Sequence, residues 1–287
     1  ARWYWPDAAT QAHETLADAR DAGQAPLGYH LAGESAWSLQ YQPRGLVYRA
    51  YLAGEKESRF RGYWAHEKNT GWMWDITLGG HVGLLRYGTA GPNRPEGFQI
   101  DLEGAAMPRL DLEQDADLTA ADFRFGIPVT YGTAAHQVKL AFYHLSSHLG
   151  DEFLLRNPGF LRLNYSRDAL VYGHSWYPAD ELRLYAEIGY AFGPDVADPL
   201  ELQFGVEHSP ACATGPRGAP FAAVAGHLRE EVHFGGNLVV QVGWAWRGDP
   251  ASGLLRTGFE YYYGKSDQFS LFDQHEDKAG LAIWYDY

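Results

Sequence analysis

Apolar and polar residues alternate along many short segments of this chain. In "LELQFGVEH" (200–208), Leu200, Leu202, Phe204 and Val206 occupy every second position, with charged, amide or glycine residues between them. The segments 182–192, 238–246 and 254–263 repeat this pattern. A period of two places successive side chains on opposite faces of a β-strand. These segments also have the length of about 9–11 residues that a tilted strand needs to cross a bilayer.

The alternation continues over most of the chain and predicts an all-β fold. The expected strands cover residues 45–66, 70–88, 95–111, 118–130, 134–148, 159–177, 181–193, 199–208, 219–231, 237–247, 253–263 and 277–287. This gives roughly twelve strands, an even number as bacterial single-chain barrels have. We therefore predict a transmembrane, antiparallel, up-and-down β-barrel over residues 45–287, with an apolar outer face that ends in aromatic girdles.

A soluble β-sandwich is the alternative, because its strands alternate as well. The polar faces of the expected strands, however, carry many ionisable residues: Asp101, Glu103, Arg124, Lys139, Arg162, Arg183, Glu187, Glu201, Arg256 and Glu260. So many ionisable groups do not fit a dry core and predict a polar lumen instead. Twelve strands enclose a narrow lumen. Charges of both signs would pair across it, so we expect the lumen to be occluded.

Two expected strands fit the pattern less well. Residues 159–177 form one strand only if Arg167 faces lipid, and a charged side chain in that position is energetically unfavourable. Residues 45–66 contain "AGEKES", so this stretch is either one imperfect strand or two pieces.

The first part of the chain, residues 1–44, has a different pattern. Helix-forming and acidic residues follow Pro6-Asp7, and Gly23 is a stop signal. We predict a short helical segment that lies beneath the barrel on the periplasmic side, in its lumen as a plug, or on a partner.

Charge and cysteine content narrow the class of protein. The net charge is −13, and no basic stripe is present, so nucleic acid is not an expected partner. The lone Cys212 forms no internal disulfide. No signal segment opens the sequence, so the chain is either cytosolic or already processed. The barrel pattern favours an outer-membrane protein of a Gram-negative-type envelope whose signal peptide has been removed.

Several stretches, among them "YHLSSHLGDEF" and "GFEYYYGKSDQFSLF", resemble a bacterial family of exported, uncharacterised proteins classed as domain of unknown function 1207. The resemblance covers roughly residues 45–287. It implies a barrel fold and an outer-membrane location, and it carries no assigned activity or catalytic residue.

The segment "FYHLSSHLGDEF" (142–153) contains the candidate chemistry. Alternation continued from Phe142 places His144, Ser146 and His148 on the outer face, while Ser147 faces the lumen. An outward His-x-Ser pair on a twelve-stranded barrel is similar to the outer-membrane phospholipase, although the following residues differ.

This similarity implies a lipid acyl hydrolase in which His144 takes a proton from a nucleophilic Ser146. Backbone amides near Ser147 and Gly150 are candidates for an oxyanion hole. The candidates for orienting the histidine are Asn157, Asp151 and Glu152. No cofactor is expected, except that calcium is possible for a hydrolase.

Three other interpretations remain open. The histidines and serines can form a hydrogen-bonded rim among lipid headgroups. A metal site would use His148, Asp151 and Glu152, with His144 as a further ligand, and it needs a turn at Ser147. A narrow solute channel is the third. We predict first a structural or partner-binding barrel, in contact with outer-membrane lipids and with other envelope proteins or copies of itself. Lipid hydrolysis comes second and solute passage third.

Overall fold

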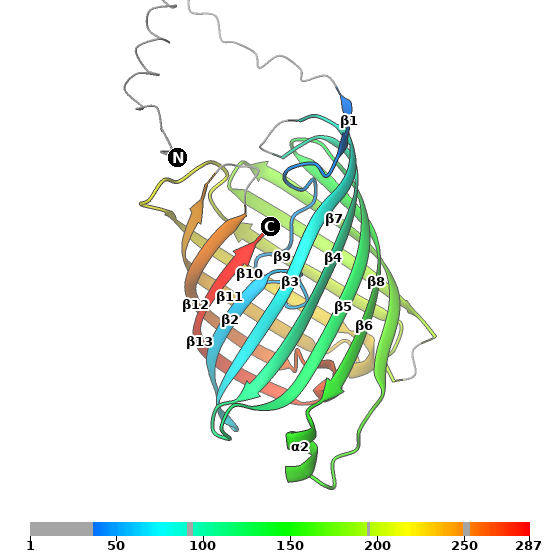
Figure 1. The fold of residues 1–287 in the computed structure, drawn as a ribbon, viewed down its shortest axis with the longest axis vertical. Coiled ribbons are helices and arrows are strands. Elements are labelled where there is room, and N and C mark those ends of the chain that lie inside the picture. The colour runs from blue at the N-terminus through cyan, green and yellow to red at the C-terminus, as the bar shows by residue number, and fades with distance from the viewer. Residues whose placement is uncertain (1–36, 91–93, 194–195, 249–252) are drawn as a thin grey trace, which may run out of the picture. The chain divides into compact units, whose positions relative to one another are not determined.

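The computed structural model describes residues 37–90, 94–193, 196–248 and 253–287. In this part of the chain, twelve antiparallel strands form a closed barrel, as predicted (Figure 1). They are β2 (Phe60–Glu67), β3 (Gly71–Gly88), β4 (Gly97–Asp111), β5 (Asp117–Gly132), β6 (His136–Leu149), β7 (Tyr165–Ala179), β8 (Leu182–Phe192), β9 (Leu200–His208), β10 (Ala219–Arg229), β11 (Gly236–Arg247), β12 (Leu254–Lys265) and β13 (His275–Asp286). Pairing of β13 with β2 closes the wall. Among the described residues, no helix is long and apolar enough to cross a membrane.

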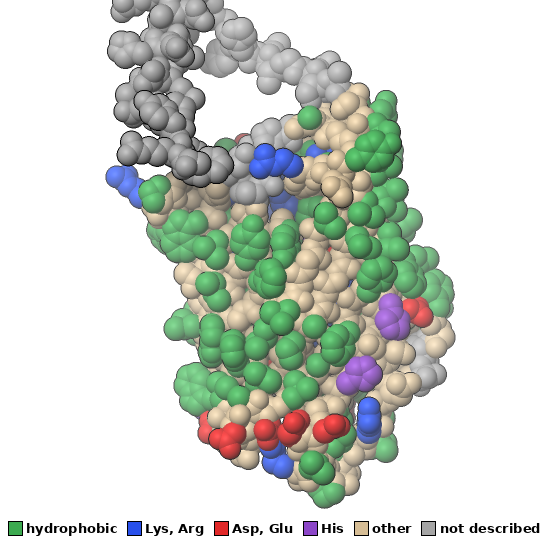
Figure 2. Space-filling view, viewed as in Figure 1, with side chains coloured by type: hydrophobic (Ala, Val, Ile, Leu, Met, Phe, Trp, Pro, Cys, Tyr) green, Lys and Arg blue, Asp and Glu red, His purple; other side chains and the backbone are tan. Residues whose placement is uncertain are grey.

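The two faces of the wall differ in chemistry. On β8, Leu184 and Ile188 are exposed on the outer face, whereas Arg183 and Tyr185 are buried inside. The other strands follow the same alternation, and Figure 2 shows hydrophobic side chains spread over the outer wall. The wall is therefore apolar outside and polar inside, as a barrel in lipid requires.

Two residues of the expected strand 159–177 lie differently from the prediction. The connection between β6 and β7 contains the short helix α2 (Asp151–Arg156), and β7 begins only at Tyr165. Arg162 therefore lies in this connection and is exposed, not in the lumen. Arg167, predicted to face lipid, is only 1% exposed and lies inside, 3.5 Å from Glu201. Within β7 the odd-numbered residues 165–175 face inward, which is the opposite of the alternation counted from position 159.

The prediction of a strand over residues 45–66 was also wrong in its first half. The short strand β1 (Ser38–Tyr41) pairs with the end of β3, and only Phe60–Glu67 forms β2. Residues 42–59 between them have no strand structure, and half of them, including 46–48 and 51–54, are buried. We call this segment the plug, because its side chains contact the inner face of the wall. The helix predicted within residues 1–44 falls mainly on residues 1–36, outside the described part of the chain.

Polar groups of the wall hold the plug in place. The backbone N–H of Leu52 donates to Glu207 at 2.7 Å, and the hydroxyl of Tyr51 donates to Glu187 at 2.8 Å. The ring of Tyr51 stacks on Tyr185 with 3.8 Å between centroids. These contacts join the plug to β8 and β9, so the carboxylates of the wall gain partners that water would otherwise supply.

Further charged contacts fix the plug on other sides. Lys56 forms an ion pair with Asp122 of β5 at 2.5 Å, and Arg59 pairs with Asp286 of β13 at 2.9 Å. Two of the hollows that border the plug have volumes of only about 40 and 30 Å³. The plug and the side chains that contact it therefore block the lumen.

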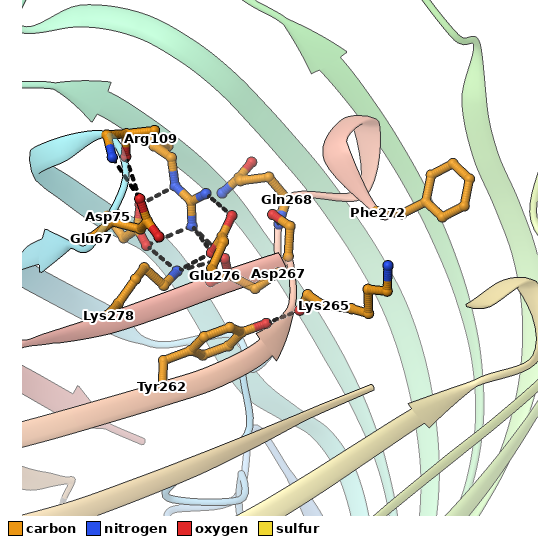
Figure 3. Close-up of polar contacts among 12 residues, drawn as sticks. Glu67, Asp75, Arg109, Tyr262, Lys265, Asp267, Gln268, Phe272, Glu276 and Lys278 are labelled. Atoms are coloured by element: carbon orange, nitrogen blue, oxygen red, sulfur yellow. Dashed lines mark hydrogen bonds and ion pairs between the residues drawn. The ribbon is translucent and has the colours of Figure 1, made fainter. Parts of the chain in front are cut away.

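A second segment enters the barrel at the end where α2 lies. Residues 266–271, between β12 and β13, are buried, and Asp267 joins a cluster of ionised side chains (Figure 3). Arg109 contacts Asp75 at 2.6 Å, Glu276 at 2.5 Å and also Asp267. Lys278 lies 2.8–3.0 Å from the same three carboxylates. We call these five residues the ionic cluster; it ties the inserted connection to β3, β4 and β13.

The filled lumen predicts that the native barrel does not conduct ions in planar bilayers. Replacing residues 46–57 by a glycine-serine linker removes the side chains that fill the lumen, so this variant is expected to show discrete conductance steps. Single-channel recording of both proteins checks the prediction. A steady open pore in the native protein would contradict it.

The ionic cluster predicts a large effect on stability. Arg109→Ala leaves three buried carboxylates with Lys278 as their one cation in the cluster, and is expected to lower the free energy of unfolding by about 3–5 kcal/mol. Arg156→Ala is the control: it removes the exposed pair with Asp117, and such pairs contribute about 0–1 kcal/mol. Urea unfolding in lipid vesicles measures both. Equal effects of the two substitutions would argue against the role of the cluster.

Candidate functional site

The outer face of β6 changes from apolar to polar toward the α2 end of the barrel. Leu140 and Phe142 are exposed, and the next outward positions hold His144, Ser146 and His148. The intervening Ser147 is buried, and its hydroxyl bonds the hydroxyl of Ser270, 2.8 Å away in the inserted connection. Figure 2 shows histidine and acidic side chains that interrupt the hydrophobic surface on one side of the barrel.

His144 has an acidic partner on the neighbouring strand. Its Nδ1 lies 2.8 Å from Oδ1 of Asp168 on β7, which is the residue directly opposite in the strand pairing. The two side chains are 48% and 53% exposed on the outer wall. With Asp168 as acceptor, the proton of the neutral ring lies on Nδ1, so Nε2 is the basic nitrogen.

The residues that the sequence predicted as orienting groups lie on α2 and directly after it. Asn157 follows α2, and its side chain donates to the carbonyl of Phe153 at 2.9 Å. Asp151 and Glu152 form the first turn of α2. The partner at His144 is Asp168 instead, which sequence reasoning missed because it placed Arg167 outside. Correct alternation in β7 would have pointed to Asp168.

Aromatic side chains border this polar strip. Phe125 and Phe123 of β5 lie opposite His144 and Ser146 in the strand pairing, and both are exposed. On the other side, Ser146 lies opposite Ser166 of β7. The arrangement places two hydroxyls and an imidazole–carboxylate pair beside an apolar surface. It suits proton transfer to and from an apolar molecule that carries a polar group.

The expected oxyanion donors and metal ligands have different surroundings. The backbone N–H of Gly150 donates to the carbonyl of Thr119 at 2.9 Å, so it is already engaged. The ring of His148 lies near Phe123, with 6.0 Å between centroids. Within the described ranges, no three His, Cys, Asp or Glu side chains are grouped closely enough to hold a metal ion.

The ionisable residues expected in the lumen line it, apart from Arg162. They are Asp101, Glu103, Arg124, Lys139, Arg183, Glu187, Glu201, Arg256 and Glu260. Arg124 pairs with Glu103 at 2.5 Å, and Lys139 pairs with Glu187 at 2.7 Å. Arg183 donates to the plug carbonyls of Arg49 and Ala50. These side chains are occupied with one another and with the plug, which gives them a structural role.

The predicted set of luminal charges did not include other members of this network, namely Arg59, Arg61, Asp75, Arg86, Arg109, Asp122, Arg229, Asp267, Glu276, Lys278 and Asp286. Arg59 lies in the plug and Asp267 in the connection that folds inward. Both segments lack the alternation that identified the other luminal charges, so the sequence offered no signal for them.

Solved structures with similar folds are outer-membrane barrels. Outer membrane phospholipase A from Escherichia coli is 12% identical, with a TM-score of 0.52 over 80% of this chain and 92% of that one. The Salmonella typhi outer membrane phospholipase, solved as a dimer with bound calcium, is 12% identical with a TM-score of 0.54 over 80% and 90% of the two chains. The KdgM porin is 8% identical with a TM-score of 0.43 over 79% and 99%.

The similarity to the two phospholipase structures supports the barrel fold. A comparison with curated proteins gave no match. The family model described as "Protein of unknown function (DUF1207)" matches residues 32–287. The chain therefore belongs to the DUF1207 family.

Proposed function

We propose that this protein is an integral outer-membrane barrel that hydrolyses acyl esters of membrane lipids on its outer wall. Ser146 acts as the nucleophile, His144 as the general base, and Asp168 orients His144. The observation that carries the proposal is the 2.8 Å contact between His144 Nδ1 and Asp168 Oδ1 on the outer face, two residues from Ser146.

The position of this pair is the main physical argument. Ionisable side chains on a lipid-facing surface are costly, and within membranes they usually mark functional sites. On this wall the outward neighbours are apolar, among them Phe125, Phe142 and Leu170. An ester at the headgroup boundary of a phospholipid would reach the polar strip while its acyl chains contact these side chains. The similarity in fold to outer membrane phospholipase A supports the same interpretation.

The chemistry follows from the three side chains. The hydroxyl oxygen of Ser146 attacks the ester carbonyl carbon, and Nε2 of His144 takes the hydroxyl proton. The tetrahedral intermediate collapses, the lysolipid alcohol leaves with the proton from His144, and an acyl group remains on Ser146. Water then attacks the acyl carbon by the same route and releases a fatty acid. Throughout, Asp168 holds Nδ1–H and stabilises the imidazolium.

A structural or partner-binding role in the envelope is the second candidate. The observation that favours it is the filled lumen: the plug and the inserted connection both contact the wall, which suits a rigid scaffold. The same observation argues against the narrow solute channel. Lipids would surround the barrel in either case, and its exposed aromatic residues also suit contact with another envelope protein or a second copy.

Turnover of phospholipid vesicles tests the proposal. Ser146→Ala, His144→Ala and Asp168→Asn are each expected to lower fatty-acid release by about a thousandfold or more, because the coupled groups act as a unit. Ser166→Ala is the matched control, since it removes the opposite hydroxyl and is expected to retain activity. Heat-modifiable migration in gels checks that every variant is folded.

The assay is run with calcium and with a chelator, because the sequence left a calcium requirement open. Release of fatty acid under at least one condition, lost in the three variants, supports hydrolysis. No release under either condition would contradict hydrolysis and leave the structural role.

A further inference from the structure

The first wall strand of the barrel is interrupted. Both β1 and β2 run antiparallel to β3: β2 pairs with residues 71–78 of β3, and β1 pairs with residues 85–88 (Figure 1). Between them the chain leaves the wall as the plug. Within the described residues, positions 79–83 of β3 therefore pair with β4 on one side and have no strand on the other, and Leu84 lies at a register shift.

At each end of this gap, one backbone carbonyl of β3 accepts a hydrogen bond from outside the sheet pairing. The backbone N–H of Gln42 donates to the carbonyl of Leu84 at 3.0 Å. The hydroxyl of Tyr287, next to the end of β13, donates to the carbonyl of Gly79 at 2.8 Å. An open sheet edge is not tolerated in hydrocarbon unless its polar groups find partners. These two bonds give partners to the β3 carbonyls at the ends of the gap and so stabilise the interrupted wall.

A slot follows the gap from the outer face inward. A hollow of about 420 Å³ is lined by Gly80, Val82, Leu102, Gly104, Phe125 and Tyr287, together with His81 and Glu103. A second hollow of about 220 Å³ shares His81, Val82 and Tyr287, and it reaches Pro43, Gly45 and Leu46 of the plug. The larger hollow, which is open to the outer surface, lies by itself in the range of about 300–1,000 Å³ that is typical of small-molecule sites.

Gly80 is the residue that keeps the slot open. A Cβ atom added there would meet nothing within 4 Å, and the φ angle of this glycine lies outside the left-handed region. Neither backbone conformation nor close packing therefore requires glycine at this position. On the neighbouring strand, Gly104 lies directly opposite. The pair of glycines leaves a depression between the exposed Val82 and the end of the chain.

The chemistry of the slot fits an acyl chain. Exposed aromatic residues near both ends of β3, Trp72 and Tyr87, bracket the slot, which places it at the level of the hydrocarbon layer. The residues that line its outer hollow include no Lys or Arg. The two polar lining residues have partners: His81 lies 3.4 Å from Asp101 and 3.8 Å from Glu103, and Glu103 also pairs with Arg124.

We propose that this slot binds one acyl chain of a bilayer phospholipid whose headgroup remains at the membrane surface. The site lies on β3, β4 and the end of the chain, apart from His144 on β6. It does not depend on the proposed hydrolysis, and a lipid held there has a structural or positioning role.

Retention of lipid by the purified full-length protein tests the proposal. Native mass spectrometry in mild detergent is expected to show one phospholipid bound per native barrel. Gly80→Phe fills the slot and is expected to reduce this occupancy at least about tenfold. Ala222→Phe is the matched control, because it adds the same side chain to an exposed outward position on β10. Val82→Phe provides a second filling variant if Gly80→Phe does not fold.

Photo-cross-linking in phosphatidylcholine vesicles locates the chain. A lipid with a diazirine in its acyl chain is expected to label peptides that contain Val82, Leu102 or Tyr287 several times more than other outward-facing peptides, and the filling variants are expected to lose this excess. Equal lipid retention in native and filled proteins, or labelling spread evenly around the wall, would overturn the proposal.

Discussion

The alternation of side chains between lipid and lumen is the constraint on which the rest of the structure depends. In a closed wall, a shift of one residue moves every side chain to the opposite face. Arg167 and Asp168 are neighbours in the chain, yet one contacts Glu201 inside the barrel and the other contacts His144 outside. The same rule collects charges of both signs in the lumen. These buried charges need partners. Some pair with one another across the wall, and the plug and the inserted connection supply further partners.

The sequence predicted much of this fold because the alternation is regular in most strands. The closed twelve-stranded barrel and its polar interior followed from it. The prediction failed where alternation stops. Residues 42–59 contain Tyr51 and Leu52, which are residue types that sequence patterns assign to strands. Their positions are set instead by contacts with Glu187 and Glu207, more than a hundred residues away. Such contacts leave no periodic signal in the local sequence.

The candidate site was predictable only in part, for the same physical reason. The outward positions of His144 and Ser146 follow from alternation within β6. The acidic partner lies on β7, and its face depends on where that strand begins after the α2 connection. Counting from residue 159 gave the wrong face for Arg162 and Arg167, and so hid Asp168. The slot beside Gly80 was also hidden, because it arises from pairing of β1 and β2 with the same strand.

Outer and inner faces of this barrel therefore have separate roles. Side chains in the interior pack together and neutralise one another's charges. The outer face, in contrast, carries a histidine–aspartate pair whose position packing does not explain. Treatment of the folded protein in lipid vesicles with a fluorophosphonate, followed by peptide mapping, tests this distinction most directly. A lipid-facing Ser146 activated by His144 predicts a single adduct on Ser146 that is absent from the His144→Ala variant. An adduct on the inward-facing Ser147, or labelling of Ser146 that persists without His144, would contradict it.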